Sequence, residues 1–286
     1  MAGRMNVQMV VHGGPAALLD VMEGLVTWNA KALRKGMAPK LDAARHVRYV
    51  ASPTWLDAPA AAHDGIASAG TLAAWRAAEL RNQYNDPTVR VGLVSGVPVV
   101  LAGTGSERRL LEDPSEGRGR TMVQPIVVGS DGDRVTEYLM VTIDDRATSV
   151  EDIGDSMARH NAKLITARGL PPLYDSGVKY KTEDGEFWWD AQEIVNNGFD
   201  DCEGLSAYRA GEILAAGGEA AVVTRLITVP NAFMGGGGGG RLFHAIVRAR
   251  DRDGKMQYDD PSARLGMPSP TWHAEQLRKE RKAGAL

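Results

Sequence analysis

The stretch that decides the fold is "NNGFDDCEGLSAYRAGEIL", Asn196 to Leu214, because an earlier part of the chain repeats it. From His63 to Leu80 the chain reads "HDGIASAGTLAAWRAAEL", and a shift of 133 residues aligns the two without a gap. Six of the seventeen aligned pairs that begin at Asp64 are identical. Both stretches predict an alanine-rich helix after a glycine. Only the later one holds a cysteine, Cys202, the single cysteine of the chain.

The segments before the two stretches also correspond. "NAKALRKGMAP" (29–39) precedes the first stretch, and "NAKLITARGLPP" (161–172) precedes the second at nearly the same distance. Two helices that resemble each other only in alanine content would not extend the likeness to their flanks. We therefore predict an internal duplication, with one unit over residues 1–150 and the other over residues 151–286.

Each unit has the same predicted order of elements. A first helix is expected at 15–35 and again at 149–168, and a second helix at 70–82 and again at 202–216. Strands separated by turn signals then complete each unit. This order predicts an α+β fold built of two tandem units, each with helices followed by an antiparallel sheet.

Composition and charge exclude several classes of protein. The chain has 286 residues, 43% of them apolar, and a net charge of −3, so a packed core is expected and a nucleic-acid partner is not. The basic run "RKERK" (278–282) in the C-terminal tail is expected to be a solvated helix face. The absence of a secretory leader or a long apolar run, together with a single cysteine, predicts a cytoplasmic protein with no membrane partner.

The residues around Cys202 favour a reactive thiol on some grounds and oppose it on others. Gly198 ends the preceding element, and Asp200 or Asp201 can cap the helix that Cys202 opens. The helix dipole favours a thiolate there, and the free amides can receive an oxyanion. The nearby carboxylates, including Glu203, oppose the thiolate, so a cationic partner is needed. Lone cysteines are more often buried and inert, and both interpretations remain open at this point.

His244 and Asp260 could supply the partner and its support. His244 lies in the apolar strand "RLFHAIVRA", and Asp260 follows in "QYDDPSARLGM" after a turn at Asp253. On neighbouring strands, the two side chains could form a hydrogen bond that fixes one imidazole tautomer. Each alone has an ordinary alternative, a structural histidine and a turn. Their occurrence together with Cys202 favours nucleophilic catalysis, which requires no metal or cofactor.

This order and spacing resemble the transglutaminase-like branch of the papain-like cysteine enzymes. The resemblance is to the transglutaminase-like cysteine peptidases of tailed phages and prophages, whose pattern includes "G-D-C-E-D-L", "R-A-x-E-L" and "D-P-S-x-x-L-G-M". This chain has "DDCEGLSAYRAGEIL" and "DDPSARLGM", within a match that covers Leu170 to Met267. Two departures flank the nucleophile. Gly204 stands where an acidic residue is usual, and Asp200 stands where glycine is usual.

The resemblance implies a mechanism and a class of substrate. Cys202 would attack an amide or ester carbonyl to give a thioester, with His244 as the proton acceptor and Asp260 orienting His244. Water as the second substrate makes a peptidase and an amine makes a transamidase, and the sequence leaves both open. A protein or peptide is the expected substrate, with other phage structural proteins as further partners. Candidates for a second oxyanion donor are Gln192, Asn196, Asn197 and Trp189.

The first unit lacks this chemistry. Ala69 stands at the place of Cys202, and Gln124 in "VQPIV" is a weaker counterpart of His244. "EDPS" (112–115) echoes "DDPS" but precedes Gln124, which puts it out of order. We therefore expect a degenerate, inactive copy that serves as a scaffold, a binding surface or a dimer-like partner for the second unit.

Other features keep two interpretations each. The glycine run at 235–240 could be a mobile flap or a tether, and Trp188 and Trp189 could line a groove or pack in the core. A second class of function also stays open, a structural or adaptor protein of a virion or phage-like particle with a vestigial or assembly-only site. The expected location is the cytoplasm of a bacterial host or such a particle, and homo-oligomerisation is left open.

Overall fold

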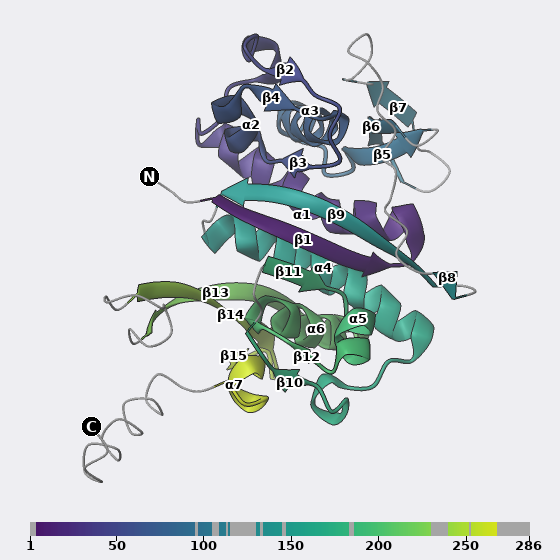
Figure 1. The fold of residues 1–286 in the computed structure, drawn as a ribbon, viewed down its shortest axis with the longest axis vertical. Coiled ribbons are helices and arrows are strands. Elements are labelled where there is room, and N and C mark those ends of the chain that lie inside the picture. The colour runs from purple at the N-terminus through teal and green to yellow at the C-terminus, as the bar shows by residue number, and fades with distance from the viewer. Residues whose placement is uncertain are drawn as a thin grey trace.

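Two long helices, α1 (Gly14–Arg34) and α4 (Ala147–Arg168), pack against each other in the computed structural model (Figure 1). A Cβ atom at Gly24 of α1 would lie 2.6 Å from the carbonyl oxygen of Asp152 in α4, so the crossing requires glycine. The structure describes residues 4–94, 97–104, 109–112, 114, 130–131, 134–144, 147–182, 186–229, 240–251 and 253–267.

A mixed sheet combines strands from both parts of the chain. Its order is β11 (Glu186–Trp189), β1 (Arg4–His12), β9 (Arg134–Asp144) and β3 (Trp55–Leu56), and β8 (Ser130–Asp131) pairs with β9. The strands β1 and β9 are antiparallel, whereas β11 runs parallel to β1 and β3 runs parallel to β9. Figure 1 shows these strands between the two sets of remaining elements. Strand β9 precedes α4 as β1 precedes α1, so the second half of the structure begins at β9. Each outer strand then pairs with a strand of the other half, and the two halves are interlocked.

The elements that follow the two long helices occur twice in the same order. Each series has a 3₁₀ turn, a short strand, a strand of the mixed sheet, a short helix, a second short strand, a longer helix and a three-stranded antiparallel sheet. The first series is η1 (Leu41–Ala43), β2 (Arg48–Tyr49), β3, α2 (Ala58–Asp64), β4 (Ile66–Ala67), α3 (Ala69–Tyr84), β5 (Arg90–Val94), β6 (Val97–Ala102) and β7 (Arg109–Glu112). The second is η3 (Leu173–Asp175), β10 (Lys179–Tyr180), β11, α5 (Ala191–Asn197), β12 (Phe199–Asp200), α6 (Cys202–Ala215), β13 (Ala220–Val229), β14 (Gly240–Arg250) and β15 (Met256–Asp259), with α7 (Pro261–Arg264) at its end.

Side-chain contacts recur along with the elements. In both series an arginine of the longer helix pairs with a glutamate one turn later and with a carboxylate at the end of the last strand. These sets are Arg76 with Glu79 and Glu112, and Arg209 with Glu212 and Asp259. Both glutamates also accept the backbone N–H of the first residue of a 3₁₀ turn. These shared residues hold the helix to its sheet and to the preceding loop.

The predicted helices lie close to the observed ones, and the fold is a mixed α and β structure, compatible with the α+β prediction. The sequence analysis missed the mixed sheet and its two long strands, β1 and β9. Residue 150, the predicted boundary between units, lies inside α4. Among the residues that the structure describes, no helix is both long and apolar enough to cross a membrane. Residues 235–239 of the glycine run, Gln124, and the basic run at 278–282 lie outside the described residues.

Candidate functional site

Cys202 is the first residue of α6, as the sequence predicted. Asp201 caps the helix, and its Oδ1 accepts the backbone N–H of Glu203 at 3.3 Å. Asp200, the other candidate cap, instead accepts the backbone N–H of Asp201 at 2.9 Å. The Cys202 thiol donates to Glu203 Oε2 at 3.0 Å, so in this arrangement its proton is directed to a carboxylate.

The structure joins His244 and Asp260 across two neighbouring strands. His244 lies on β14, Asp260 follows β15, and His244 Nε2 is 2.9 Å from Asp260 Oδ2. Asp260 also caps α7 by accepting the backbone N–H of Ala263 at 3.0 Å. Burial raises the pKa of Asp260, but the hydrogen bonds from His244 and Ala263 outweigh it and lower the pKa. The ionised carboxylate can therefore orient the imidazole.

The other ring nitrogen of His244 is available to a third group. His244 is buried, with 5% of its surface exposed, and its Nδ1 has no hydrogen-bond partner among the described residues. The backbone N–H of the next residue, Ala245, lies near enough to the Cys202 sulfur to act against the rise in the pKa of the thiol. The thiol thus lies against β14 beside His244. The structure joins His244 to Asp260 through Nε2 and places the Cys202 sulfur by the residue next to His244, while His244 Nδ1 has no partner among the described residues.

The thiol is neutral in this arrangement. Burial raises the pKa of Cys202 well above its usual range, and the negative charges of Glu203 and Asp201 raise it further. Burial and Glu203 likewise raise the pKa of Asp201. Ionisation of the thiol therefore requires a base that removes the proton and leaves a cation nearby. His244 is the group beside it that can do both.

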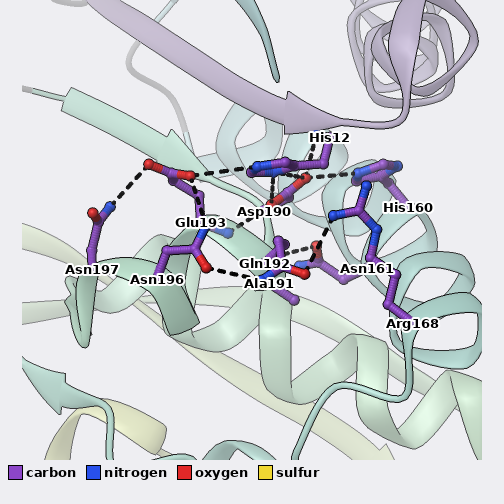
Figure 2. Close-up of polar contacts among 10 residues, drawn as sticks. All are labelled: His12, His160, Asn161, Arg168, Asp190, Ala191, Gln192, Glu193, Asn196 and Asn197. Carbon is purple, nitrogen blue, oxygen red and sulfur yellow. Dashed lines mark hydrogen bonds and ion pairs between the residues drawn. The ribbon is translucent and has the colours of Figure 1, made fainter. Parts of the chain in front are cut away.

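Three of the four proposed oxyanion donors already have hydrogen-bond partners. Gln192 Nε2 donates to Asn196 Oδ1 at 3.0 Å, Arg168 donates to Gln192 Oε1 at 3.3 Å, and Asn196 Nδ2 donates to Glu193 (Figure 2). Asn197 Nδ2 also donates to Glu193. A role for these side-chain amides as oxyanion donors stays a prediction, and it would require them to break these hydrogen bonds.

The two tryptophans have different environments. Trp188 is buried in the core, so core packing is the correct alternative for it. Trp189 is partly exposed and contacts Phe187 and Phe199, with ring centroids 6.0 Å and 5.5 Å away. Phe199 lies on β12, three residues before Cys202. Of the upstream candidates, Trp189 is therefore the one that contacts the strand preceding Cys202.

A buried polar network at the junction of the two halves was missed by the sequence analysis (Figure 2). Asp190 caps α5, accepts the backbone N–H of His12, and lies 3.0 Å from His12 Nδ1 and 3.2 Å from His160 Nε2. Burial would raise the pKa of Asp190, but the hydrogen bonds from the two histidines outweigh it and hold the pKa well below its usual range. The shift of 133 residues aligns Asp190 with Asp57, which caps α2, so the repeat contained the signal.

The first half places other residues at the positions of the thiol and the imidazole. Ala69 opens α3 as Cys202 opens α6. The strand pairings give the counterpart of His244. Val100 on β6 pairs with Glu112, as Val247 on β14 pairs with Asp259. His244 lies three residues before Val247, so its counterpart is Val97, three residues before Val100. Val97 replaces Gln124 as the counterpart. The echo of "DDPS" by "EDPS" is therefore in order, which corrects the sequence analysis.

Comparisons with known proteins add no relative. No protein-family model matches the chain, and no curated protein or solved structure matches it. Within the described ranges, no group of three or more His, Cys, Asp or Glu side chains is arranged to hold a metal ion.

Proposed function

We propose that the chain is a cysteine-dependent amide hydrolase or acyl transferase with Cys202, His244 and Asp260 as its catalytic triad. One observation carries the proposal. His244 is held by Asp260 through Nε2, while its buried Nδ1 is unpartnered among the described residues, beside a backbone N–H that contacts the sulfur. A histidine with a purely structural role would be expected to use both ring nitrogens in such a buried place.

The reaction begins with a transfer of the thiol proton to His244 Nδ1. The thiolate attacks the carbonyl carbon, and the electron pair of the C=O bond moves to oxygen. The N-terminus of α6, with the backbone N–H of Cys202, stabilises this oxyanion. Collapse of the intermediate breaks the bond to the leaving group, which takes the proton from His244 and leaves a thioester. Water or an amine then attacks the thioester carbonyl while His244 takes its proton. Collapse of this second intermediate breaks the C–S bond, releases the product and returns the proton to the Cys202 sulfur.

The fold assignment and the biological setting belong to the same proposal. Two tandem transglutaminase-like units, the first inactive, fit the repeated order of elements and the recurring ion pairs of Arg76 and Arg209. A phage or prophage setting and a protein or peptide substrate are supported by the motif resemblance alone.

Thiol chemistry tests the proposal directly. Cys202 should react with iodoacetamide well below pH 8, and His244→Ala should slow the reaction by about 100-fold because the base is lost. A broad acylating probe should form an adduct that maps to Cys202. His63→Ala, which changes an exposed histidine on α2, is the matched control. A native thiol whose reactivity is ordinary and indifferent to the His244 change would exclude the catalytic function.

A second candidate is a structural or adaptor protein of a virion or phage-like particle. The observation that favours it is the contact between the thiol and Glu203, in a setting that raises the thiol pKa. Under this alternative the resting arrangement is permanent, and Cys202→Ser leaves every property of the protein intact. Loss of a measured hydrolase or transferase activity in that variant would exclude the alternative.

A further inference from the structure

The carboxylate of Asp200 occupies the space that a side chain at residue 204 would fill. A Cβ atom built on Gly204 would lie 1.7 Å from Asp200 Oδ2 and 2.6 Å from its Cγ. Such distances exclude any side chain at residue 204 while Asp200 stays in place. Asp200 is completely buried. Glycine lowers the stability of a helix, so its presence in the first turn of α6 needs this packing reason.

Residue 204 is also the position from which a helix-capping carboxylate normally acts. With Asp201 as the cap, Gly204 is the third residue of the helix. In a capping box, an acidic side chain at that third position accepts the backbone N–H of the cap residue. Here Asp200 Oδ1 accepts that N–H, from Asp201, at 2.9 Å. Asp200 therefore fills the space of a third-position side chain and also makes its hydrogen bond.

The first half shows the opposite choice at the same two places. Ala67 aligns with Asp200, and Thr71 aligns with Gly204 as the third residue of α3. Thr71 Oγ1 lies 3.0 Å from the Oγ of its cap residue, Ser68, and the Thr71 backbone N–H donates to that Oγ. A polar side chain therefore stands on the helix in the first half and on the preceding strand in the second, and Thr71 Oγ1 accepts the N–H of Leu56 rather than that of its cap residue. The small residue is Ala67 on the strand in the first half and Gly204 on the helix in the second half.

We infer that Asp200 is a positioning residue for Cys202, and that Asp200 and Gly204 form one compensating pair. This inference rests on the proposed role of Cys202 as nucleophile. By fixing the N–H of Asp201, the Asp200 carboxylate sets where α6 begins, and so where the thiol and its backbone N–H stand relative to His244. The two residues that flank the nucleophile are thus linked, because the Asp200 carboxylate fills the space that Gly204 leaves open.

A double-mutant cycle tests the pairing. Asp200→Ala removes the acceptor of the Asp201 N–H, and Gly204→Asp forces a second carboxylate into occupied space, so each alone should slow acylation of Cys202 about tenfold or more. Asp200→Ala/Gly204→Asp returns the carboxylate to the helix and should recover most of the wild-type rate. Losses that simply add in the double variant would overturn the inference, because independent sites are additive.

A second readout separates positioning from general stability. Asp200→Ala should alter the pH dependence of Cys202 alkylation, and Asp200→Asn, which keeps an oxygen that can accept the Asp201 N–H, should restore it. Thr71→Ala in the first half is the control, which should lower the melting temperature without changing that pH profile. An unchanged profile in Asp200→Ala would leave Asp200 with a structural role alone and contradict the inference.

The failure of this inference differs from the failure of the proposed function. If His244→Ala leaves the thiol reactivity unchanged, the proposed function fails. If His244→Ala slows the thiol but the changes at Asp200 and Gly204 leave its pH profile and acylation rate unaltered, only the positioning role fails.

Discussion

The first turns of α3 and α6 begin at equivalent places but differ in the residues that open and cap the two helices. Ala69 opens one helix and Cys202 the other, and the cap changes from Ser68 to Asp201. One turn further along, the arginine and glutamate that bind the sheet and the preceding loop are the same. The comparison shows that the ion pairs that hold the helix recur in both halves, whereas the residue that opens the helix differs between them.

A second difference lies beneath the short helices. In both halves an aspartate caps the helix, and an asparagine, Asn29 or Asn161, accepts the N–H of the first helical residue at 2.8 Å. In the first half, Asp57 binds the indole N–H of Trp28 at 2.8 Å. In the second half, His160 takes the place of Trp28, and His12 joins it. The second half has titratable groups where the first has an inert one.

The largest expected effect comes from giving the second half the residue of the first. His244→Val copies Val97 and should slow alkylation of Cys202 at neutral pH by about 100-fold or more, since it removes the proposed base and leaves the thiol beside carboxylates that disfavour its ionisation. Stopped alkylation assays with mass detection measure the rate. Val97→Ala is the matched change in the first half and should leave the rate unaltered. A fall of less than about threefold in His244→Val would contradict the comparison.

Removal of the buried caps should have the next largest effect. Asp190→Ala takes an acceptor from two imidazoles and uncaps α5, for a loss of about 3 kcal/mol in the free energy of unfolding. Asp57→Ala removes the acceptor of one indole N–H and uncaps α2, and it should lower the free energy of unfolding by about 2 kcal/mol. Urea unfolding measures both. An equal or larger loss for Asp57→Ala would contradict the comparison.

The lowered pKa of Asp190 also predicts how stability depends on pH. Because its pKa in the folded protein lies below the ordinary value of 3.8, Asp190 contributes stability above that value. The contribution is lost as the pH falls from there toward the folded pKa. Asp190→Asn should therefore flatten this part of the plot of unfolding free energy against pH, while His63→Ala should not. An unchanged slope in Asp190→Asn would exclude Asp190 as its source.

A smaller effect is expected from neutralising Glu203, whose carboxylate accepts the hydrogen bond from the thiol. Burial and then Glu203 raise the pKa of Cys202, so Glu203→Gln should lower that pKa and speed alkylation at pH 7 by about three- to tenfold. The sign follows because a negative neighbour disfavours a second negative charge. A pH series of alkylation rates measures the shift. A slower reaction in Glu203→Gln would mean that Glu203 assists ionisation.

The smallest effect tests what the halves share. Arg76→Ala breaks three ion pairs and Arg209→Ala breaks two, and because the pairs are partly exposed each change should cost about 1 kcal/mol or less, by similar amounts. Both losses should shrink in high salt. Thermal unfolding at two salt concentrations checks this. A large loss for one arginine and none for the other would show that the recurring contacts are not equivalent in energy.

The sequence predicted the helices and the order of the site residues because both depend on local signals. Caps, helical periodicity and turn residues are written near the elements that they specify, as at Asp201 and Asp260. The mixed sheet depends on pairings between distant segments, such as Val7 with Glu186, which no local pattern encodes. The counterpart of His244 was also misplaced. Similarity of sequence favoured Gln124, whereas the strand register assigns Val97 to this place.

The interlocked sheet has a consequence for synthesis of the protein. Strand β1 leaves the ribosome before its partners β9 and β11, which lie more than a hundred residues further along the chain. Until the second half is made, β1 has two unsatisfied edges, and α1 lacks the helix against which it packs. The first half cannot complete its fold during translation by itself. A chaperone that shields a bare strand edge should therefore improve the yield of soluble protein, and a fragment that stops at residue 133 should aggregate.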